Sequence, residues 1–89
     1  MKVVLTIVGM DKVGIIAKVS NTLADCNINI LNINQNIMQG FFNMVMIAET
    51  SEASAPLGEC KEQLKKLGEE IGVEIRMQSE DIFTAMHRI

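Results

Sequence analysis

The stretch of this sequence that looks most like a binding site is a short turn bracketed by two glycines, residues 9–15 (GMDKVGI). It follows an apolar run typical of a strand and precedes apolar residues at the spacing of a helix. The first amide N–H groups of a helix have no partner within it, and the helix dipole favours negative charge there, so a small carboxylate or phosphate could bind. Asp11 is placed to cap the helix. The turn therefore has two interpretations, an anion-binding loop and an ordinary strand-to-helix connection.

The two glycines of this turn are expected to have different tasks. Gly9 would let the backbone leave the strand at angles that a side chain forbids, whereas Gly14 would keep the first helical turn free of bulk.

A second unusual stretch is the run between residues 28 and 38, where asparagine recurs although strands are usually poor in it. Asn32, Asn34 and Asn36 alternate with apolar residues, which predicts a half-buried edge strand with one face lined by amides. Such a face suits solvent, an interface or a polar ligand, and the sequence leaves these open.

The remaining reactive residue types do not predict catalysis. Cys26 and Cys60 lie on the apolar stripes of two expected helices without a Cys-x-x-Cys spacing, which predicts buried thiols rather than a redox pair or metal ligands. His87 is the one histidine, and no nucleophile is paired with a base. We therefore expect neither an enzyme nor a bound cofactor or metal.

Composition excludes several partners. The formal net charge is −3, without a basic stripe for phosphate backbones, so no nucleic-acid binding is expected. The adjacent aromatics after Gly40 do not alternate with basic residues as in RNA-binding sheets. No apolar run is long enough to span a bilayer and no secretion signal is present, which predicts a cytoplasmic protein without a membrane partner.

The pattern of apolar residues predicts the order β-α-β-β-α-β over one domain, residues 1–89. Strands are expected at residues 2–9, 28–38, 41–48 and 73–78, and helices at about 14–25, between Ser54 and Gly72 with Pro56 in the first turn and, as a short terminal helix, at about 80–89. Asn27 is expected to end the first helix, Ser54 to cap the second and Ser79 the third. This is the ferredoxin-like α+β sandwich with a four-stranded antiparallel sheet, in which the strands at 2–9 and 41–48 are central.

The two central strands carry apolar residues on both faces, although two helices cover only one. A domain of 89 residues buries only about 60 to 65% of its unfolded surface, and a large uncovered apolar face marks an interaction site. The terminal helix could cover part of that face, from its own chain or from another. A symmetric homodimer is the commonest way to cover the rest.

At residues 9–16 and 25–30 (GMDKVGII and DCNINI) the chain resembles the ACT domain, a small-molecule-sensing module of amino-acid metabolism. Its terminal helix resembles that of small free-standing bacterial and archaeal ACT proteins, and the likeness extends to glycine-cleavage repressor relatives. The resemblance implies a regulatory homodimer that binds an amino acid near the subunit interface and acts on another protein.

The resemblance also implies the ligand contacts. Backbone N–H groups of the loop would meet the ligand carboxylate, Asp11 would take its ammonium, Lys12 would offset the added negative charge, and Asn29 would be the second side-chain contact. The implied set is Asp11, Lys12, Val13, Gly14, Ile15 and Asn29. The alternative is an assembly or regulatory module without a ligand.

Overall fold

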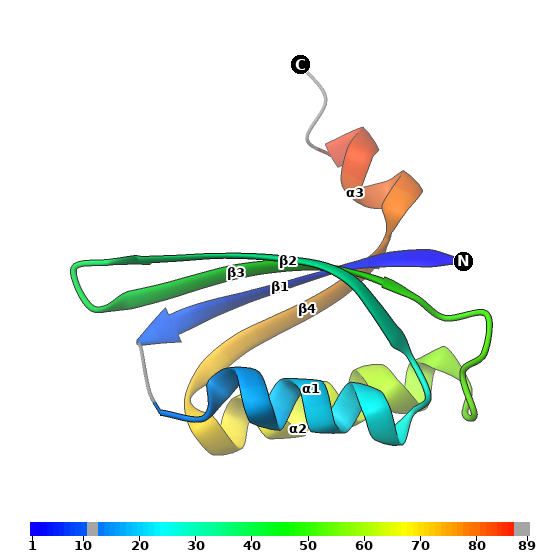
Figure 1. Cartoon of the computed structure of the whole chain (residues 1–89), viewed down its shortest axis with the longest axis horizontal. Helices are drawn as coiled ribbons and strands as arrows, with labels where there is room; N and C mark the ends of the chain where they lie inside the picture. The colour runs from blue at the N-terminus through cyan, green and yellow to red at the C-terminus, as the bar shows by residue number, and fades with distance from the viewer. Residues whose placement is uncertain (11–12, 87–89) are drawn as a thin grey trace.

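The computed structural model describes residues 1–10 and 13–86, and it has the expected element order (Figure 1). The strands form one four-stranded antiparallel sheet in the order β2-β3-β1-β4, so β1 and β3 are central as predicted. The strands are β1 (Lys2–Met10), β2 (Asn29–Met38), β3 (Phe41–Glu49) and β4 (Val73–Ser79). The helices are α1 (Ile15–Asp25), α2 (Leu57–Ile71) and α3 (Glu80–Met86). The predicted ferredoxin-like fold with a short terminal helix is confirmed.

The core lies between the sheet and the layer formed by α1 and α2 (Figure 1). Alternate residues of the central strands point into it, because successive side chains of a strand face opposite ways. Apart from Phe42, the core consists of aliphatic, methionine and cysteine side chains, and the sequence contains no Trp or Tyr. Its fully buried large side chains are Val3, Leu5, Ile7, Val19, Leu23, Met44, Met46, Cys60 and Leu64.

The end of α1 is fixed by Asn27, as predicted. Its backbone has φ 57°, in the left-handed region that Asn tolerates, and its side-chain Nδ2 donates to the carbonyl of Glu52 at 2.7 Å. This bond ties the helix end to the loop before α2.

The start of α2 differs from the prediction. Pro56, not Ser54, occupies the N-cap position, with an extended backbone at φ −57° and ψ 143° and no side-chain cap. The Pro56 carbonyl accepts the first helical hydrogen bonds, from the N–H groups of Glu59 and Cys60. The Ser54 N–H instead donates to the carbonyl of Cys26 at 2.9 Å, which holds the preceding loop against α1.

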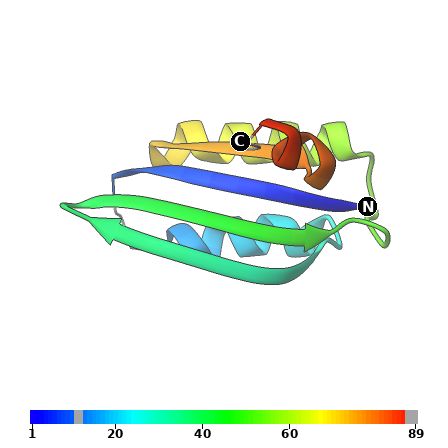
Figure 2. The same ribbon diagram turned by 90° about the horizontal axis from the view of Figure 1, so that it is seen from above.

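Among the described residues, one helix lies on the other face of the sheet, α3, which contacts β1 and β4 (Figures 1 and 2). As predicted, the Ser79 hydroxyl accepts a hydrogen bond from the third residue on, the Ile82 N–H, at 3.2 Å. The terminal helix thus covers part of this face within its own chain. The part of this face over β2 and β3 is not covered by α3. We call the whole face of the sheet opposite α1 and α2 the open face.

The edge strand β2 is more exposed than the alternating pattern predicts. All residues from Leu31 to Ile37 are exposed, including Ile33 and Ile37 on the helix side of the sheet. The hairpin of β2 and β3 extends past the start of α1, so no helix lies beneath its end (Figure 1). Three large apolar side chains of this edge, Leu31, Ile33 and Ile37, therefore need another cover.

Candidate functional site

The loop between β1 and α1 begins at the end of the central strand β1, where Met10 pairs with Phe41 of β3. Gly14, at the N-cap of α1, has φ 85°, a conformation that side chains rarely adopt. Ile15 next to it is buried and anchors the helix start in the core, whereas Val13 is fully exposed. Asp11 and Lys12 lie outside the described residues.

The two glycines of the loop have the reverse of their expected tasks. A Cβ on Gly14 would meet nothing within 4 Å, so this residue is needed for its backbone angle and not to avoid bulk. A Cβ on Gly9 would lie 2.7 Å from Val73 Cγ1 and 3.0 Å from its Cα, so Gly9 is needed for the close approach of β4.

The N-terminus of α1 has no side-chain cap from the part of the chain that the structure describes. The first helical bond runs from the Lys18 N–H to the Gly14 carbonyl at 3.0 Å, and no side chain among the described residues caps the preceding amides. Amides at a helix start without side-chain partners are suited to a carboxylate ligand.

Asn29 lies at the opposite end of the sheet from this loop. It pairs with Glu49, which pairs with Lys2, whereas the loop leaves β1 at Met10. Met10 is eight residue steps along the strand from Lys2, a distance of about 26 Å at the usual rise per residue. A single chain therefore does not bring Asn29 to the loop. A site that uses both needs a second copy.

The surroundings of Asn29 contain one organised charge pair. The N-terminal ammonium donates to Glu49 Oε2 at 2.7 Å, and the Thr50 N–H donates to the same oxygen at 3.1 Å. The bond from the ammonium lowers the pKa of the Glu49 carboxyl below its usual value. Glu49 is therefore already paired near Asn29.

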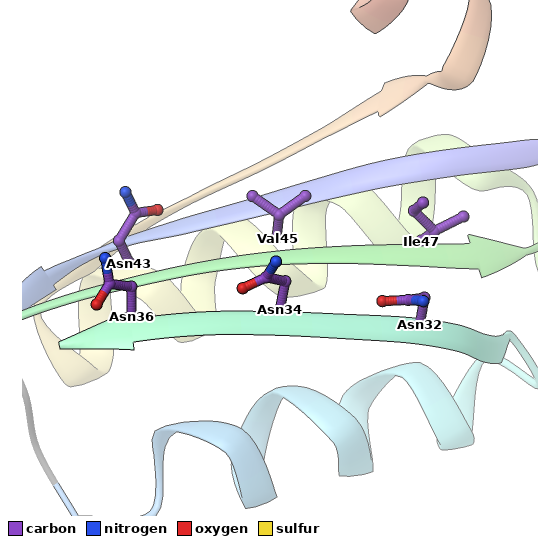
Figure 3. A pocket seen from close by; sticks show the side chains of 6 residues that line it. All are labelled: Asn32, Asn34, Asn36, Asn43, Val45 and Ile47. Atoms are coloured by element: carbon purple, nitrogen blue, oxygen red, sulfur yellow. The ribbon is translucent and has the colours of Figure 1, made fainter.

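The amides of β2 line a shallow groove of about 440 Å³ on the open face, which we call the amide groove (Figure 3). Three of its residues were expected on this face. Asn43 of β3 was not expected beside them, because its place opposite Asn36 depends on the register of the hairpin. The groove is lined by Asn32, Asn34, Asn36, Asn43, Val45 and Ile47.

The two cysteines are free and buried, as predicted. Burial, and next a hydrogen bond with Cys60, raise the pKa of the Cys26 thiol to about 11. Cys26 is therefore a protonated core residue at neutral pH and not a nucleophile.

The described residues contain no cluster of three or more His, Cys, Asp or Glu side chains that could hold a metal ion. Within the same residues, no helix is long and apolar enough to cross a membrane.

Comparisons with known proteins agree with the fold. The ACT domain family model matches residues 2–78. The UPF0237 protein of Listeria innocua is 47% identical over the full length of both chains. Among solved structures, an ACT domain protein from Streptococcus pneumoniae is 32% identical with a TM-score of 0.80, over 93% of each chain.

A more distant likeness is to the ligand-free regulatory subunit of aspartate kinase from Thermus thermophilus. It is 25% identical with a TM-score of 0.69, over 89% of this chain and 51% of that one. The matched family model spans most of the chain and the Listeria relative spans all of it. The chain therefore belongs to the ACT domain family.

Proposed function

We propose that this protein is a non-catalytic regulatory module that binds a free amino acid as a homodimer and transmits its binding to a partner protein. The observation that carries the proposal is the start of α1, a glycine-capped helix N-terminus without a described side-chain cap, in a chain of the ACT family. The likeness to a regulatory subunit of aspartate kinase supports the same class of function.

The loop is suited to the carboxylate end of an amino acid. The N–H groups of Val13, Gly14 and Ile15 would donate to the carboxylate, where the helix dipole adds to the attraction. Asp11 would accept from the ligand ammonium, and Lys12 would offset the negative charge that Asp11 adds. An amino-acid zwitterion has a carboxylate for the loop amides and an ammonium for Asp11, whereas a phosphate would bind only the amides.

The second side-chain contact, Asn29, would come from the other subunit. The free edge of β2 can pair with the same edge of a second copy in antiparallel orientation, as a two-fold axis requires. The partner's strand then runs the opposite way, so its Asn29 end lies beside the Met38 end of β2. Met38 and Met10 both pair with Phe41, so that end lies two strands from the point where the loop leaves β1. Pairing by this edge would complete the site.

The same pairing would cover the exposed apolar residues of β2. Ile33 and Ile37 are 44% and 50% exposed on the helix side of the strand, where the α1 helix of the partner would approach. Exposed apolar groups of this kind favour association.

A thermal-shift screen against the twenty amino acids tests the proposal. A ligand that binds only the folded protein stabilises it by about 2.7 kcal/mol at a concentration 100 times its Kd. We expect one amino acid, or a few similar ones, to raise the melting temperature, and Asp11→Ala or Asn29→Ala to remove the rise. Lys66→Glu, on the exposed face of α2, is the control and should keep it.

The second candidate function is that of an assembly module without a ligand, which the exposed apolar edge of β2 favours. It predicts that no amino acid changes the melting temperature, while the protein still dimerises with Asp11→Ala or Asn29→Ala.

A further inference from the structure

The two edge strands of the sheet differ in their protection against further pairing. β4 carries Glu74 and Arg76, which pair with each other at 2.8 Å, and charged side chains commonly keep an edge from pairing with another strand. β2 is longer, with ten residues, and has neither a charged side chain nor a proline. By this criterion β2 is the edge that favours a second strand.

The regular part of β2 runs from Asn32 to Met38, after a register shift against β3 between Ile30 and Asn32. Its side chains alternate between the two faces of the sheet. Three of those on the open face are amides that line the amide groove, Asn32, Asn34 and Asn36 (Figure 3). Those on the helix side pair with buried residues of β3; they are Ile33, Gln35 and Ile37. β2 thus has a row of asparagines on one face and an isoleucine–glutamine–isoleucine row on the other.

This pattern is symmetric about Gln35. One residue to either side is an asparagine, Asn34 or Asn36, and two residues to either side is an isoleucine, Ile33 or Ile37. A two-fold axis normal to the sheet reverses the strand direction and keeps each face on its own side. An axis at Gln35 therefore brings each of these residues opposite one of its own type.

We propose that β2 of a second copy pairs with β2 in this one register, with Gln35 opposite the partner's Gln35. The inference rests on the β2 pairing of the proposed function and specifies which residues meet there. Ile33 then lies opposite the partner's Ile37 on the helix side, and Asn34 lies opposite the partner's Asn36 on the open face. Each of these two contacts occurs twice, once on each side of the axis.

Both kinds of contact have a physical reason. Directly opposite side chains on antiparallel strands have Cβ atoms about 4.5–5.5 Å apart, so the paired isoleucines would shield each other from water. In one chain Ile33 is 44% exposed and Ile37 is 50% exposed. An amide both donates and accepts hydrogen bonds, so two opposite asparagines can bind each other without any charge. Because this edge is complementary to itself, the strand that fits it is β2 of a second copy.

Other registers lose these contacts. A slip by one residue would place the asparagines of one copy opposite the isoleucines of the other, on the wrong face of the sheet. A slip by two residues moves the axis to Asn34 or to Asn36. With the axis at Asn34, Ile33 lies opposite the partner's Gln35, and with the axis at Asn36, Ile37 does. Both isoleucine pairs are lost in either case.

Disulfide trapping tests the register in three single-residue variants, Asn34→Cys, Gln35→Cys and Asn36→Cys. A disulfide needs Cα atoms about 4.4–6.8 Å apart, which directly opposite residues satisfy and residues two places off do not. We expect oxidation with diamide to join Gln35→Cys chains into a covalent dimer at least about tenfold faster than chains of the other two variants. Lys66→Cys on α2 measures linkage by random collision, and the two native cysteines are buried.

A second measurement replaces the isoleucine pairs with charges. One chain carries Ile33→Lys and Ile37→Lys, and the other carries Ile33→Glu and Ile37→Glu. Like charges would lie opposite each other in a dimer of either chain, and opposite charges would do so in the mixed dimer. We expect the mixed dimer to have a dissociation constant at least about tenfold lower than either homodimer, measured by analytical ultracentrifugation. Equal constants would rule out the Ile33–Ile37 contact.

The trapping rates separate the register from the proposed function. Fastest linkage in Asn34→Cys or in Asn36→Cys would overturn the register and leave β2 pairing standing. Linkage no faster than that of Lys66→Cys in all three variants would contradict the register and the β2 pairing together. Binding of an amino acid is measured separately, in the thermal-shift screen of the wild type, so a failure there leaves the trapping result unchanged.

Discussion

Two glycines of α2 show how single atoms limit this fold. A Cβ on Gly68 would lie 2.6 Å from the carbonyl oxygen of Val73, whereas a Cβ on Gly58 would meet nothing within 4 Å. Alanine is the better helix former at both positions, but at Gly68 it would force α2 away from β4. We expect Gly68→Ala to lower the free energy of unfolding by about 1–3 kcal/mol, and Gly58→Ala to raise it by up to about 1 kcal/mol. Denaturant unfolding measures both, and equal effects would contradict the packing described here.

The thiol of Cys26 gives a prediction about pH. Its pKa in the folded protein is raised to about 11, above the unfolded value of about 8.5, so the folded state holds the proton to a higher pH. Stability from this group is complete below about pH 8.5 and is lost as pH rises towards 11, with an amplitude on the order of 1–3 kcal/mol.

The matched variant for that measurement is Cys26→Ala. We expect its free energy of unfolding to fall less steeply between about pH 8.5 and 11 than that of the wild type, because both proteins share every other titrating group. Parallel curves for the two proteins would show that Cys26 has no raised pKa.

At the scale of elements, the free edge of β2 is the part of the sheet most suited to contact with another chain. Ile33 is exposed on the helix side of this edge strand, near the middle of the proposed pairing. We expect Ile33→Glu to raise the dimer dissociation constant at least about tenfold, because a charge would be buried between the paired strands. Analytical ultracentrifugation measures the constant, with Lys66→Glu as the surface control. An unchanged constant for Ile33→Glu would rule out pairing by this edge.

Elements were predictable from the sequence where one periodicity dominates. Apolar residues on both faces of residues 2–9 and 41–48 indicated strands that lie at the centre of the sheet, and the 3-4 spacing of apolar residues from Leu57 to Ile71 indicated α2. The N-cap of α2 was not predictable in this way, because Ser54 has the right chemistry but its N–H is bonded to Cys26 instead. The local preference of serine for the N-cap is therefore overridden by a hydrogen bond between two segments that are distant in the sequence.

The site was less predictable than the fold. Loop and glycine spacing indicated the start of α1, but no local pattern shows that Asn29 lies about 26 Å from it along the sheet. The roles of Gly9 and Gly14 were reversed because one depends on the approach of Val73, 64 residues further along the chain. The position of Asn29 and the approach of Val73 to Gly9 both depend on strand register. Register is set by the pairing of all the strands together and not by a local sequence pattern.

At the scale of the whole molecule, the central claim is that the ligand site needs two chains. Asp11→Ala and Asn29→Ala damage different halves of it. In a dimer of one chain of each kind, both defects fall in one site and the other site is intact. Random mixing makes about half of the dimers mixed, so about a quarter of the wild-type sites return.

The most direct test is therefore calorimetric titration of the amino acid found in the thermal-shift screen into the two variants, first separately and then after mixing and exchange of subunits. We predict no binding by either variant alone and binding at about a quarter of the wild-type stoichiometry by the mixture. A mixture that binds no more than the separate variants would contradict a site shared between two chains.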